Sequence, residues 1–587
     1  MTVTEEFRAA RDHLVSVQED WERARKEFQW PRFTHFNFGF DWFDQVAASP
    51  ERAEQDALVI VEEDGRRLSR TFAQLSADSN RVANWFRSIG ISRGDRLILM
   101  LGNQVELWET MLAAIKLGAV LVPTTTQMGA YDLQDRVTRA EARWVVGDTE
   151  TLQKFTEVTG DYQLIHVPGF YAGDAATAPE VPGRRVHSYP EAYQSSAELR
   201  PEQPSGADDT LLLYFTSGTT SKPKLVEHTH TSYPVGHLST LYWIGLQPGD
   251  VHLNVSSPGW AKHAWSNFFA PWIAEATIYL YNFSKFDAAA LMQNMQEAAV
   301  TTFCAPPTVW RMLIKADLSQ LKTPPRVAVS AGEPLNAEVI EQVQRAWGCT
   351  IRDGFGQTES SLQVANTPGR QVKFGAMGVP LPGFDVALVD PISGEEAAEG
   401  EICLRLDSEL YGPPVGLMKG YYGDEEKNAE VFREGYYHTG DIASRDENGV
   451  ITYVGRADDV FKSSDYKVSP FELESVLVEH PAVVEAAIVP APDEIRLAIP
   501  KAYVTLASGW EPDERTAAEI LQFCLDKLPP YKRIRRIEFT ELPKTISGKI
   551  RRVQLRKAEE ERAQSGGAPE GYGVEYREED LAIRPKR

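Results

Sequence analysis

Cysteine is scarce in this sequence. Only four cysteines occur in 587 residues, and no two of them form a Cys-x-x-Cys pair. Successive cysteines lie at least 45 residues apart, at Cys304, Cys349, Cys403 and Cys524. This spacing excludes a disulfide framework and the usual structural zinc sites, and it predicts a reducing, cytoplasmic location.

The sequence also lacks a long apolar run. The longest one, 111–122, contains Lys116 and is too short to cross a bilayer. The first 20 residues have no apolar core and include the acidic residues Glu5, Glu6, Glu19 and Asp20. We therefore expect neither a membrane span nor a signal peptide.

Basic residues are in the minority. The 61 Lys and Arg residues face 84 Asp and Glu residues, which gives a formal net charge of −23. A nucleic-acid-binding protein needs a strongly basic face, so this balance argues against nucleic acid as the partner. The composition is otherwise that of a globular protein, and the length suits two or three domains.

Helix and strand patterns alternate in the first part of the chain. Residues 75–90 and 105–117 have the apolar spacing of helices, whereas 97–101 and 119–122 are typical of buried strands. This alternation predicts an α/β fold with parallel-rich sheets covered by helices. Strand patterns dominate 384–405, which indicates a further β-rich subdomain.

The composition changes near Asp458, where a polar, charged stretch precedes an amphipathic helix pattern at 471–480. We place a domain boundary there. The prediction is a large N-terminal domain over 1–457, a small α+β C-terminal domain over 458–560, and a loosely ordered tail over 561–587.

A Ser/Thr/Gly-rich loop follows the apolar run 211–215. Hydroxyl groups and a flexible glycine allow such a loop to wrap a polyphosphate, and Lys224 supplies countercharge. The loop lacks the spacing of a Walker A motif, and an ordinary polar loop is the alternative. The candidate phosphate-binding residues are Thr216, Ser217, Gly218, Thr219, Thr220 and Lys224.

This loop resembles the signature of the adenylate-forming (AMP-binding) superfamily of acyl-CoA synthetases, adenylation domains and luciferases. Ser221 stands where that family commonly has Gly, and Glu227-His228 resembles the short- and medium-chain acyl-CoA synthetase branch. The resemblance extends over about 38–552 with the motifs in family order. It implies ATP, Mg²⁺ and coenzyme A as cofactors, and a C-terminal domain that moves.

The stretch 353–359 resembles the family's second signature. By that resemblance Phe355 would stack on adenine, Thr358 would bind the α-phosphate, and Glu359 would be the Mg²⁺ ligand. The loop at 332–334 resembles the segment that flanks adenine. The nucleotide site implied by these two stretches comprises Gly332, Glu333, Pro334, Asp353, Gly354, Phe355, Gly356, Gln357 and Thr358.

Three later motifs complete the resemblance. In the ribose motif, the Asp441 carboxylate would accept the ribose hydroxyls. Arg456 would contact ribose or phosphate, and Asp458 would be the hinge. Lys549 would be the catalytic lysine of adenylation, acting with the catalytic residues Thr358 and Glu359.

The loop after the hinge departs from the family pattern. Asp465 and Ser469 replace glycines, and Lys467, which we count among the nucleotide-binding residues, replaces an arginine. The first of these glycines lies by the pantetheine tunnel in relatives that make thioesters. A carboxylate there adds bulk and charge, so the sequence leaves open whether thiolation is altered.

The acyl pocket of the family is built partly from the segment 257–265. By resemblance, its candidates here are Trp260, Lys262, His263 and Trp265. The alternative for the two tryptophans is a plain core role. The sequence favours a medium-chain fatty or aromatic acid without identifying it.

The function predicted is an ATP-dependent carboxylic acid–CoA ligase that forms an acyl-adenylate and then an acyl-CoA. One alternative is a stand-alone adenylation enzyme that serves a carrier protein or an amine. Another is a ligand-binding homologue without catalysis. The sequence is nearly silent on oligomeric state, with a homodimer as one option.

Overall fold

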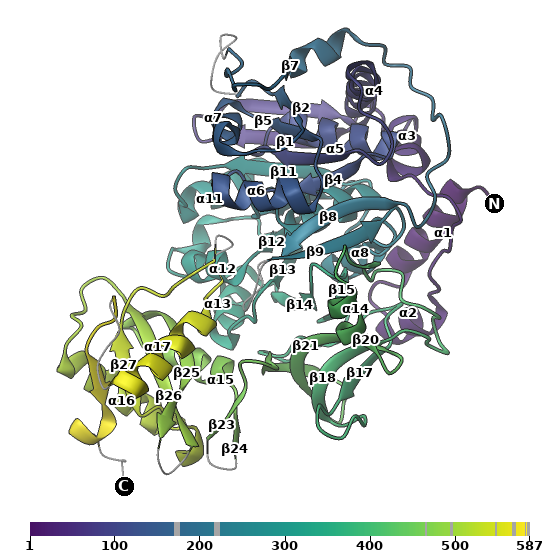
Figure 1. Ribbon diagram of the computed structural model, residues 1–587. Helices are drawn as coiled ribbons and strands as arrows, with labels where there is room; N and C mark the ends of the chain where they lie inside the picture. The colour runs from purple at the N-terminus through teal and green to yellow at the C-terminus, as the bar shows by residue number, and fades with distance from the viewer. Residues whose placement is uncertain are drawn as a thin grey trace.

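The computed structural model describes residues 1–169, 177–216, 223–463, 466–493, 497–545, 549–565, 571–581 and 583. Two large mixed sheets and their helices form the main body, next to a smaller antiparallel sheet. Figure 1 shows the C-terminal elements, in green to yellow, gathered in a separate group at the lower left. The predicted α/β class, with a large N-terminal part and a smaller C-terminal part, is confirmed.

The first sheet has eight strands in the order β19-β9-β8-β4-β3-β5-β6-β7. The six strands from β8 to β7 are parallel to one another, whereas β9 pairs antiparallel with β8 and β19 pairs antiparallel with β9 at that edge. Their bounds are β3 (Arg96–Met100), β4 (Val120–Pro123), β5 (Trp144–Gly147), β6 (Gln163–His166), β7 (Val186–Ser188), β8 (Thr210–Thr216), β9 (Lys224–Thr229) and β19 (Gly420–Tyr421).

The second sheet has nine strands in the order β16-β15-β14-β13-β12-β10-β11-β1-β2. It is parallel from β14 to β1 and antiparallel at both ends. The bounds are β1 (Asp56–Glu62), β2 (Arg67–Thr71), β10 (Val251–Asn254), β11 (Thr277–Asn282), β12 (Thr302–Ala305), β13 (Val327–Ala331), β14 (Arg352–Gly356), β15 (Leu362–Ala365) and β16 (Val379–Pro380).

Both sheets are buried on two faces. In β3, Leu97 and Leu99 belong to the central core that also contains Ile278 and Val329 of the second sheet. The alternate residue Ile98 belongs to a separate outer core. Because successive strand residues point to opposite faces, this division means that each sheet carries one apolar layer on each side.

Helices fill the space between the sheets and cover their outer faces. The central core includes side chains of α4 (Phe72–Ile89), α5 (Val105–Leu117) and α8 (Leu238–Ile244). Helix α6 (Ala130–Arg139) covers the first sheet. The second sheet is covered by α11 (Ala288–Glu297), α12 (Pro307–Leu313) and α13 (Ala337–Trp347). The predicted helix at 75–90 begins at Phe72 and ends at Gly90, which adopts a left-handed cap.

The β-rich segment is an antiparallel sheet of β17 (Val386–Val389), β18 (Glu399–Arg405), β20 (Phe432–Arg433), β21 (Tyr436–Arg445) and β22 (Ile451–Arg456). After it come the hairpin β23 (Phe461–Ser463) and β24 (Tyr466–Val468), and helix α15 (Pro470–Leu477). The C-terminal sheet contains β25 (Val483–Asp493), β26 (Leu497–Leu506), β27 (Arg536–Phe539) and β28 (Glu575–Arg577), with α16 (Glu514–Lys527) and α17 (Arg552–Ser565).

The prediction of a loosely ordered tail over 561–587 is wrong for part of that segment. Helix α17 continues to Ser565, and Glu575 lies in β28, which pairs with β27. A Glu575 carboxylate oxygen lies 2.8 Å from Nζ of Lys501, a fully buried lysine that also contacts Glu538 and Glu559. Composition alone missed this partnership because the lysine is remote in sequence.

Within the described ranges, no helix is both long enough and apolar enough to span a membrane.

Candidate active site

A cleft of about 1910 Å³ lies where the carboxyl ends of β8, β13 and β14 meet β21 and β22. From the C-terminal part, Lys549, Ile550, Arg552 and Val553 also line it. Open parallel sheets characteristically bind ligands outside the carboxyl ends of their strands. The cleft therefore lies where the topology favours a ligand.

The ends of the predicted phosphate loop are held by a β-hairpin. Thr216, the last residue of β8, pairs with Lys224, the first residue of β9. Nζ of Lys224 lies 5.0 Å from the centre of the Tyr421 ring. Burial lowers the pKa of Lys224, and the nearby Glu359 carboxylate opposes that shift. The remaining predicted loop residues, Ser217, Gly218, Thr219 and Thr220, lie outside the described residues.

Asp353 joins the two predicted adenine segments. Its carboxylate accepts hydrogen bonds from the backbone N–H of Gly354 at 2.9 Å and of Leu335 at 3.3 Å. Gly332 begins the loop between β13 and Leu335 with φ of +108°, a conformation that favours glycine. Burial raises the pKa of Asp353 to about 7. Glu333 and Pro334 line the cleft, with the Glu333 carboxylate 3.7 Å from Arg311.

Gly356 is required by a close approach rather than by its torsion angles. A Cβ atom at this position would lie 2.8 Å from the backbone oxygen of Ser361 and 2.9 Å from the Trp265 ring. Phe355, the predicted adenine-stacking residue, also lines the cleft. The small residue thus allows β14 to end against Trp265 beside the cleft.

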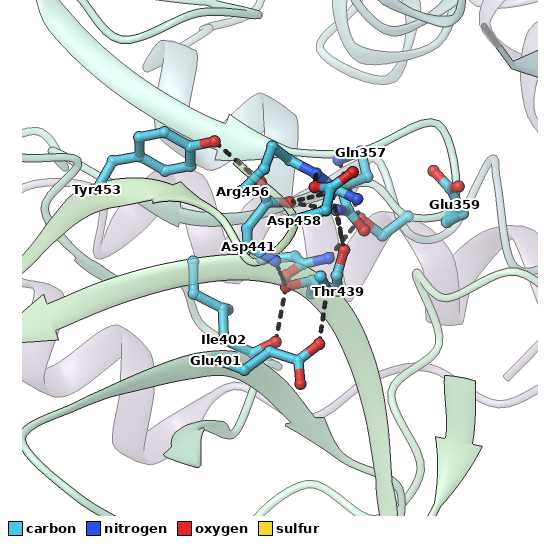
Figure 2. A network of polar contacts seen from close by, with 12 residues as sticks. Gln357, Glu359, Glu401, Ile402, Thr439, Asp441, Tyr453, Arg456 and Asp458 are labelled. Atoms are coloured by element: carbon cyan, nitrogen blue, oxygen red, sulfur yellow. Dashed lines mark hydrogen bonds and ion pairs between the residues drawn. The ribbon is translucent and has the colours of Figure 1, made fainter. Parts of the chain in front are cut away.

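Asp441 is the centre of a polar network (Figure 2). Its carboxylate accepts hydrogen bonds from Nε2 of Gln357 at 2.6 Å, the Tyr453 hydroxyl at 3.1 Å and Nη1 of Arg456 at 3.2 Å. The orientation of Gln357 follows from the Tyr437 hydroxyl, which donates to its Oε1. The sequence predicted Asp441, Arg456 and Gln357. It gave no role to Tyr437, which opens the ribose motif, and it missed Tyr453, which lies outside every motif.

Burial raises the pKa of Asp441, while the charges of Arg456 and, more weakly, Lys549 act against that rise. Lys549 lines the same cleft, although it lies 108 positions later in the chain. Its backbone N–H is held by Oγ1 of Thr545 at 3.1 Å. The structure thus brings the predicted catalytic lysine and the predicted ribose-binding carboxylate to one site.

Glu401 supports the turn that carries Asp441. It accepts hydrogen bonds from the backbone N–H of Gly440 at 2.7 Å and from Nδ1 of His438 at 2.8 Å. Among the described residues, Glu401, His438 and Cys403 form a group of potential metal ligands. These hydrogen bonds account for the close approach, and Mg²⁺ prefers oxygen ligands, so we assign the group a structural role.

Glu359 lies to one side of the Asp441 network in Figure 2. Its Oε1 accepts a hydrogen bond of 2.8 Å from the hydroxyl of Tyr421, which is buried. Its other carboxylate oxygen has no partner among the described residues. An oxygen ligand is therefore available on the cleft wall, as a Mg²⁺ ion bound to nucleotide phosphates requires.

The peptide group of Thr358, which precedes Glu359, is also held. Its backbone oxygen lies 2.7 Å from Nε2 of His228, and the other ring nitrogen of that histidine lies 3.1 Å from the Ser232 hydroxyl. Burial lowers the pKa of His228 to about 4, so the ring is neutral. Of the Glu227-His228 pair that the sequence singled out, His228 thus holds the peptide group at the wall of the cleft.

The predicted hinge residue Asp458 lies in the turn after β22. Its carboxylate is 3.4 Å from Nε of Arg456. Of the departures after the hinge, Ser469 caps α15 by accepting the N–H of Glu472 at 3.2 Å, and its hydroxyl donates to the backbone oxygen of Val454. Asp465 and the side chain of Lys467 lie outside the described part of the chain.

The four predicted acyl-pocket residues divide into two groups. Trp260 and His263 line a small cavity next to the cleft. Lys262 instead donates from Nζ to the backbone oxygen of Ala331 at 2.9 Å, and Trp265 donates to the Tyr233 hydroxyl at 2.7 Å. The latter two line the large cleft rather than the small cavity.

Comparison with known proteins agrees with this geometry. Residues 44–422 match the AMP-binding enzyme family, and residues 472–549 match the AMP-binding enzyme C-terminal domain. The chain is 42% identical over 535 residues to 4-hydroxybutyrate–CoA ligase 1 of Metallosphaera sedula, with 90% of this chain and 92% of that protein covered. It is 34% identical over 553 residues to the mitochondrial acyl-coenzyme A synthetase ACSM3 of Homo sapiens, with 92% of each covered.

Among solved structures, the anthranilate CoA ligase AuaEII in complex with anthranoyl-AMP has a TM-score of 0.78 and 28% identity, with 91% of this chain and 99% of that chain covered. A benzoate CoA ligase from Burkholderia xenovorans LB400 has a TM-score of 0.73 and 28% identity, with 89% and 100% covered. This chain matches both family models, and the alignments cover 92% of each of the two curated relatives. It therefore belongs to the AMP-binding enzyme family, within its acyl-CoA synthetases.

Proposed function

We propose that the chain is an AMP-forming carboxylic acid–CoA ligase. The observation that carries this proposal is the convergence of Lys549, Glu359, Asp441 and Arg456 on one cleft beside a small apolar cavity. The four groups come from three separate parts of the chain. The fold alone does not require that they meet.

In the first half-reaction, a carboxylate oxygen of the acid attacks the α-phosphorus of ATP. An acyl oxygen–phosphorus bond forms, and the bond to pyrophosphate breaks. The protein's task is to align two anions and to offset the negative charge that develops between them. Lys549 supplies positive charge at the reacting groups, Thr358 binds the α-phosphate, and the loop from Thr216 to Lys224 holds the outer phosphates.

Asp441 and Arg456 bind the nucleoside end. The Asp441 carboxylate is already oriented by three donors, so it presents a fixed acceptor to the ribose hydroxyls. Glu359 would hold Mg²⁺, which supplies charge neutralisation to the phosphates. These residues therefore serve mainly to position the substrate, as phosphoryl chemistry demands.

In the second half-reaction, the thiol of coenzyme A attacks the acyl carbon and AMP leaves. We propose that the C-terminal part turns about Asp458, which removes Lys549 and admits the thiol. A cytoplasmic location and a homodimer belong to the same proposal. Asp465 and Lys467 depart from the family pattern in the loop after the hinge. The competing proposal for this half-reaction is therefore a different acceptor, either a carrier protein or an amine.

Three of the relatives named above are ligases of 4-hydroxybutyrate, anthranilate and benzoate, which supports a small acid as the substrate of this chain. We propose a medium-chain fatty or an aromatic acid. The test is a pair of assays on one sample. Acid-dependent ATP–pyrophosphate exchange reports adenylation, and mass detection of acyl-CoA reports thiolation. Exchange with thioester supports the ligase, and exchange without thioester supports another acceptor. Failure of both over a broad acid panel would favour the non-catalytic alternative.

A further inference from the structure

The small cavity beside the cleft is lined mostly by apolar residues, and Tyr214 and His263 bring polar groups to it. Its walls come from β3, α5 and β8 and from the segment before Trp265, and the cavity volume is about 10 Å³. They include the side chains of Leu99, Leu107, Met111, Tyr214 and Trp260. A cavity of this size has room for about one water-sized group, since a buried water needs roughly 10–15 Å³. It therefore suits the small remote end of an acid whose carboxylate lies in the large cleft.

His263 is one of the two polar residues in this wall, and its hydrogen bonds identify which ring nitrogen carries the proton. The side chain is 3% exposed, and burial lowers its pKa to about 3, so the imidazole is neutral. A neutral imidazole carries one N–H donor and one acceptor nitrogen. Which nitrogen is the acceptor decides what kind of ligand the histidine can recognise.

A chain of hydrogen bonds determines which ring nitrogen of His263 is protonated. Nδ2 of Asn282 lies 3.0 Å from the backbone oxygen of Asn103, which can only accept, so that atom is the amide nitrogen. Oδ1 of Asn282 therefore accepts from Nδ2 of Asn103, at 3.2 Å. It follows that Asn103 presents its Oδ1 to Nε2 of His263, at 3.1 Å.

Because Asn103 presents an acceptor, Nε2 of His263 must carry the proton. Nδ1 is then an unprotonated acceptor, and it has no hydrogen-bond partner within the described part of the chain. The Trp108 ring, 5.6 Å from the imidazole between ring centres, packs against the histidine. His263, a residue that lines the cavity, thus carries one oriented acceptor nitrogen.

We propose that this enzyme prefers short carboxylic acids that carry a hydroxyl group at the end remote from the carboxylate, and that His263 accepts the hydrogen bond of that hydroxyl. The inference rests on the proposed ligase function and deepens it. A neutral hydroxyl suits the site because a buried ammonium or carboxylate would lack a counter-charge there. Asn103 is a positioning residue that acts through His263.

The test compares acids that differ only at the remote end. In the wild-type enzyme, we expect kcat/KM for adenylation of 4-hydroxybutyrate to exceed that of pentanoate, its methyl analogue, by at least tenfold. 4-Oxopentanoate, whose remote carbonyl can only accept, should be as poor as pentanoate. The pair 4-hydroxybenzoate and 4-methylbenzoate distinguishes an aromatic from an aliphatic acid. A site that hydrogen-bonds a substrate hydroxyl penalises the analogue without it.

His263→Leu should reduce the hydroxyl-to-methyl preference by at least tenfold, because it removes the acceptor and keeps the wall apolar. The matched control is His187→Leu, a buried histidine in β7 that is bonded to Gln163 at 2.8 Å. That variant should leave the preference unchanged, even if the protein becomes less stable. The ratio of two substrates measured on one sample cancels any loss of folded enzyme.

Two results would overturn the inference. The first is a wild-type enzyme that uses pentanoate and 4-methylbenzoate as well as their hydroxylated partners. The second is a hydroxyl preference that survives His263→Leu. Both leave the ligase proposal intact, because pyrophosphate exchange still occurs. Absence of exchange with every acid, hexanoate and benzoate included, would refute the ligase proposal and this inference with it.

Discussion

The hydrogen bond between Tyr421 and Glu359 allows a quantitative prediction. Tyr421→Phe removes only the hydroxyl that donates to Oε1 of Glu359 at 2.8 Å. A hydrogen bond to a charged group contributes roughly 1.5–3 kcal/mol. At 1.4 kcal/mol for each factor of ten, the loss corresponds to about 10- to 150-fold in any equilibrium that depends on the held carboxylate.

If Glu359 binds Mg²⁺, that factor should appear in the metal dependence of the reaction. We expect the apparent Mg²⁺ constant for pyrophosphate exchange to rise by about 10- to 100-fold, the range typical of residues that orient metal ligands. The KM for the acid should change little, because Tyr421 does not line the small cavity. Binding of Mn²⁺ in the presence of ATP, followed by electron paramagnetic resonance, gives a readout independent of turnover.

The matched control is Tyr436→Phe. This tyrosine also donates to a glutamate, Glu396, at 3.0 Å, but neither residue lines the cleft. The control variant should keep the wild-type Mg²⁺ dependence. An unchanged Mg²⁺ constant and unchanged Mn²⁺ binding in a folded Tyr421→Phe enzyme would refute the assignment of Glu359 as the metal ligand.

Three further predictions concern catalysis and stability. Lys549→Ala should lower pyrophosphate exchange by at least about 100-fold, because it removes the positive charge that we propose acts on the reacting groups. The variant should still form thioester from a supplied acyl-adenylate, and equal loss of both half-reactions in a folded variant contradicts the proposed role. Asp353→Asn should flatten the pH dependence of the thermal midpoint. Burial raises the pKa of Asp353 to about 7 in the folded protein. The wild-type protein should therefore lose stability as pH rises from about 4 through 7, because the buried carboxyl group must ionise over that range. Scanning fluorimetry of both proteins from pH 5 to 8 measures the difference. Lys501→Met should destabilise the C-terminal part by about 3–5 kcal/mol at pH 7, because three carboxylates lose the buried cation that they share. A urea unfolding curve at pH 7 that matches that of the wild type would disprove this.

Local patterns in the sequence determined much of the fold. The helix at 105–117 was predicted with the bounds it has, because apolar periodicity and the terminal Gly118 are local signals. The segment 561–587 was predicted wrongly in part, because β28 is stabilised by β27 and by a distant lysine. A charged strand with a remote partner leaves no periodic signature.

For the site, the motifs of the sequence were enough to indicate which chemistry is available. The motifs supplied Lys549, Glu359, Asp441 and Arg456, because each lies in a short stretch whose residue types match a task. The hydrogen bonds that orient them could be found only in the folded protein. Tyr421 donates to Glu359, Tyr453 donates to Asp441, and Glu401 accepts from the backbone N–H of Gly440 in the ribose turn. It also separated His263 from Lys262, neighbours in sequence whose side chains lie at different sites. A side chain's role depends on the partners that tertiary packing brings near it. Neighbours in sequence share only a stretch of backbone, and their side chains can point to different sites.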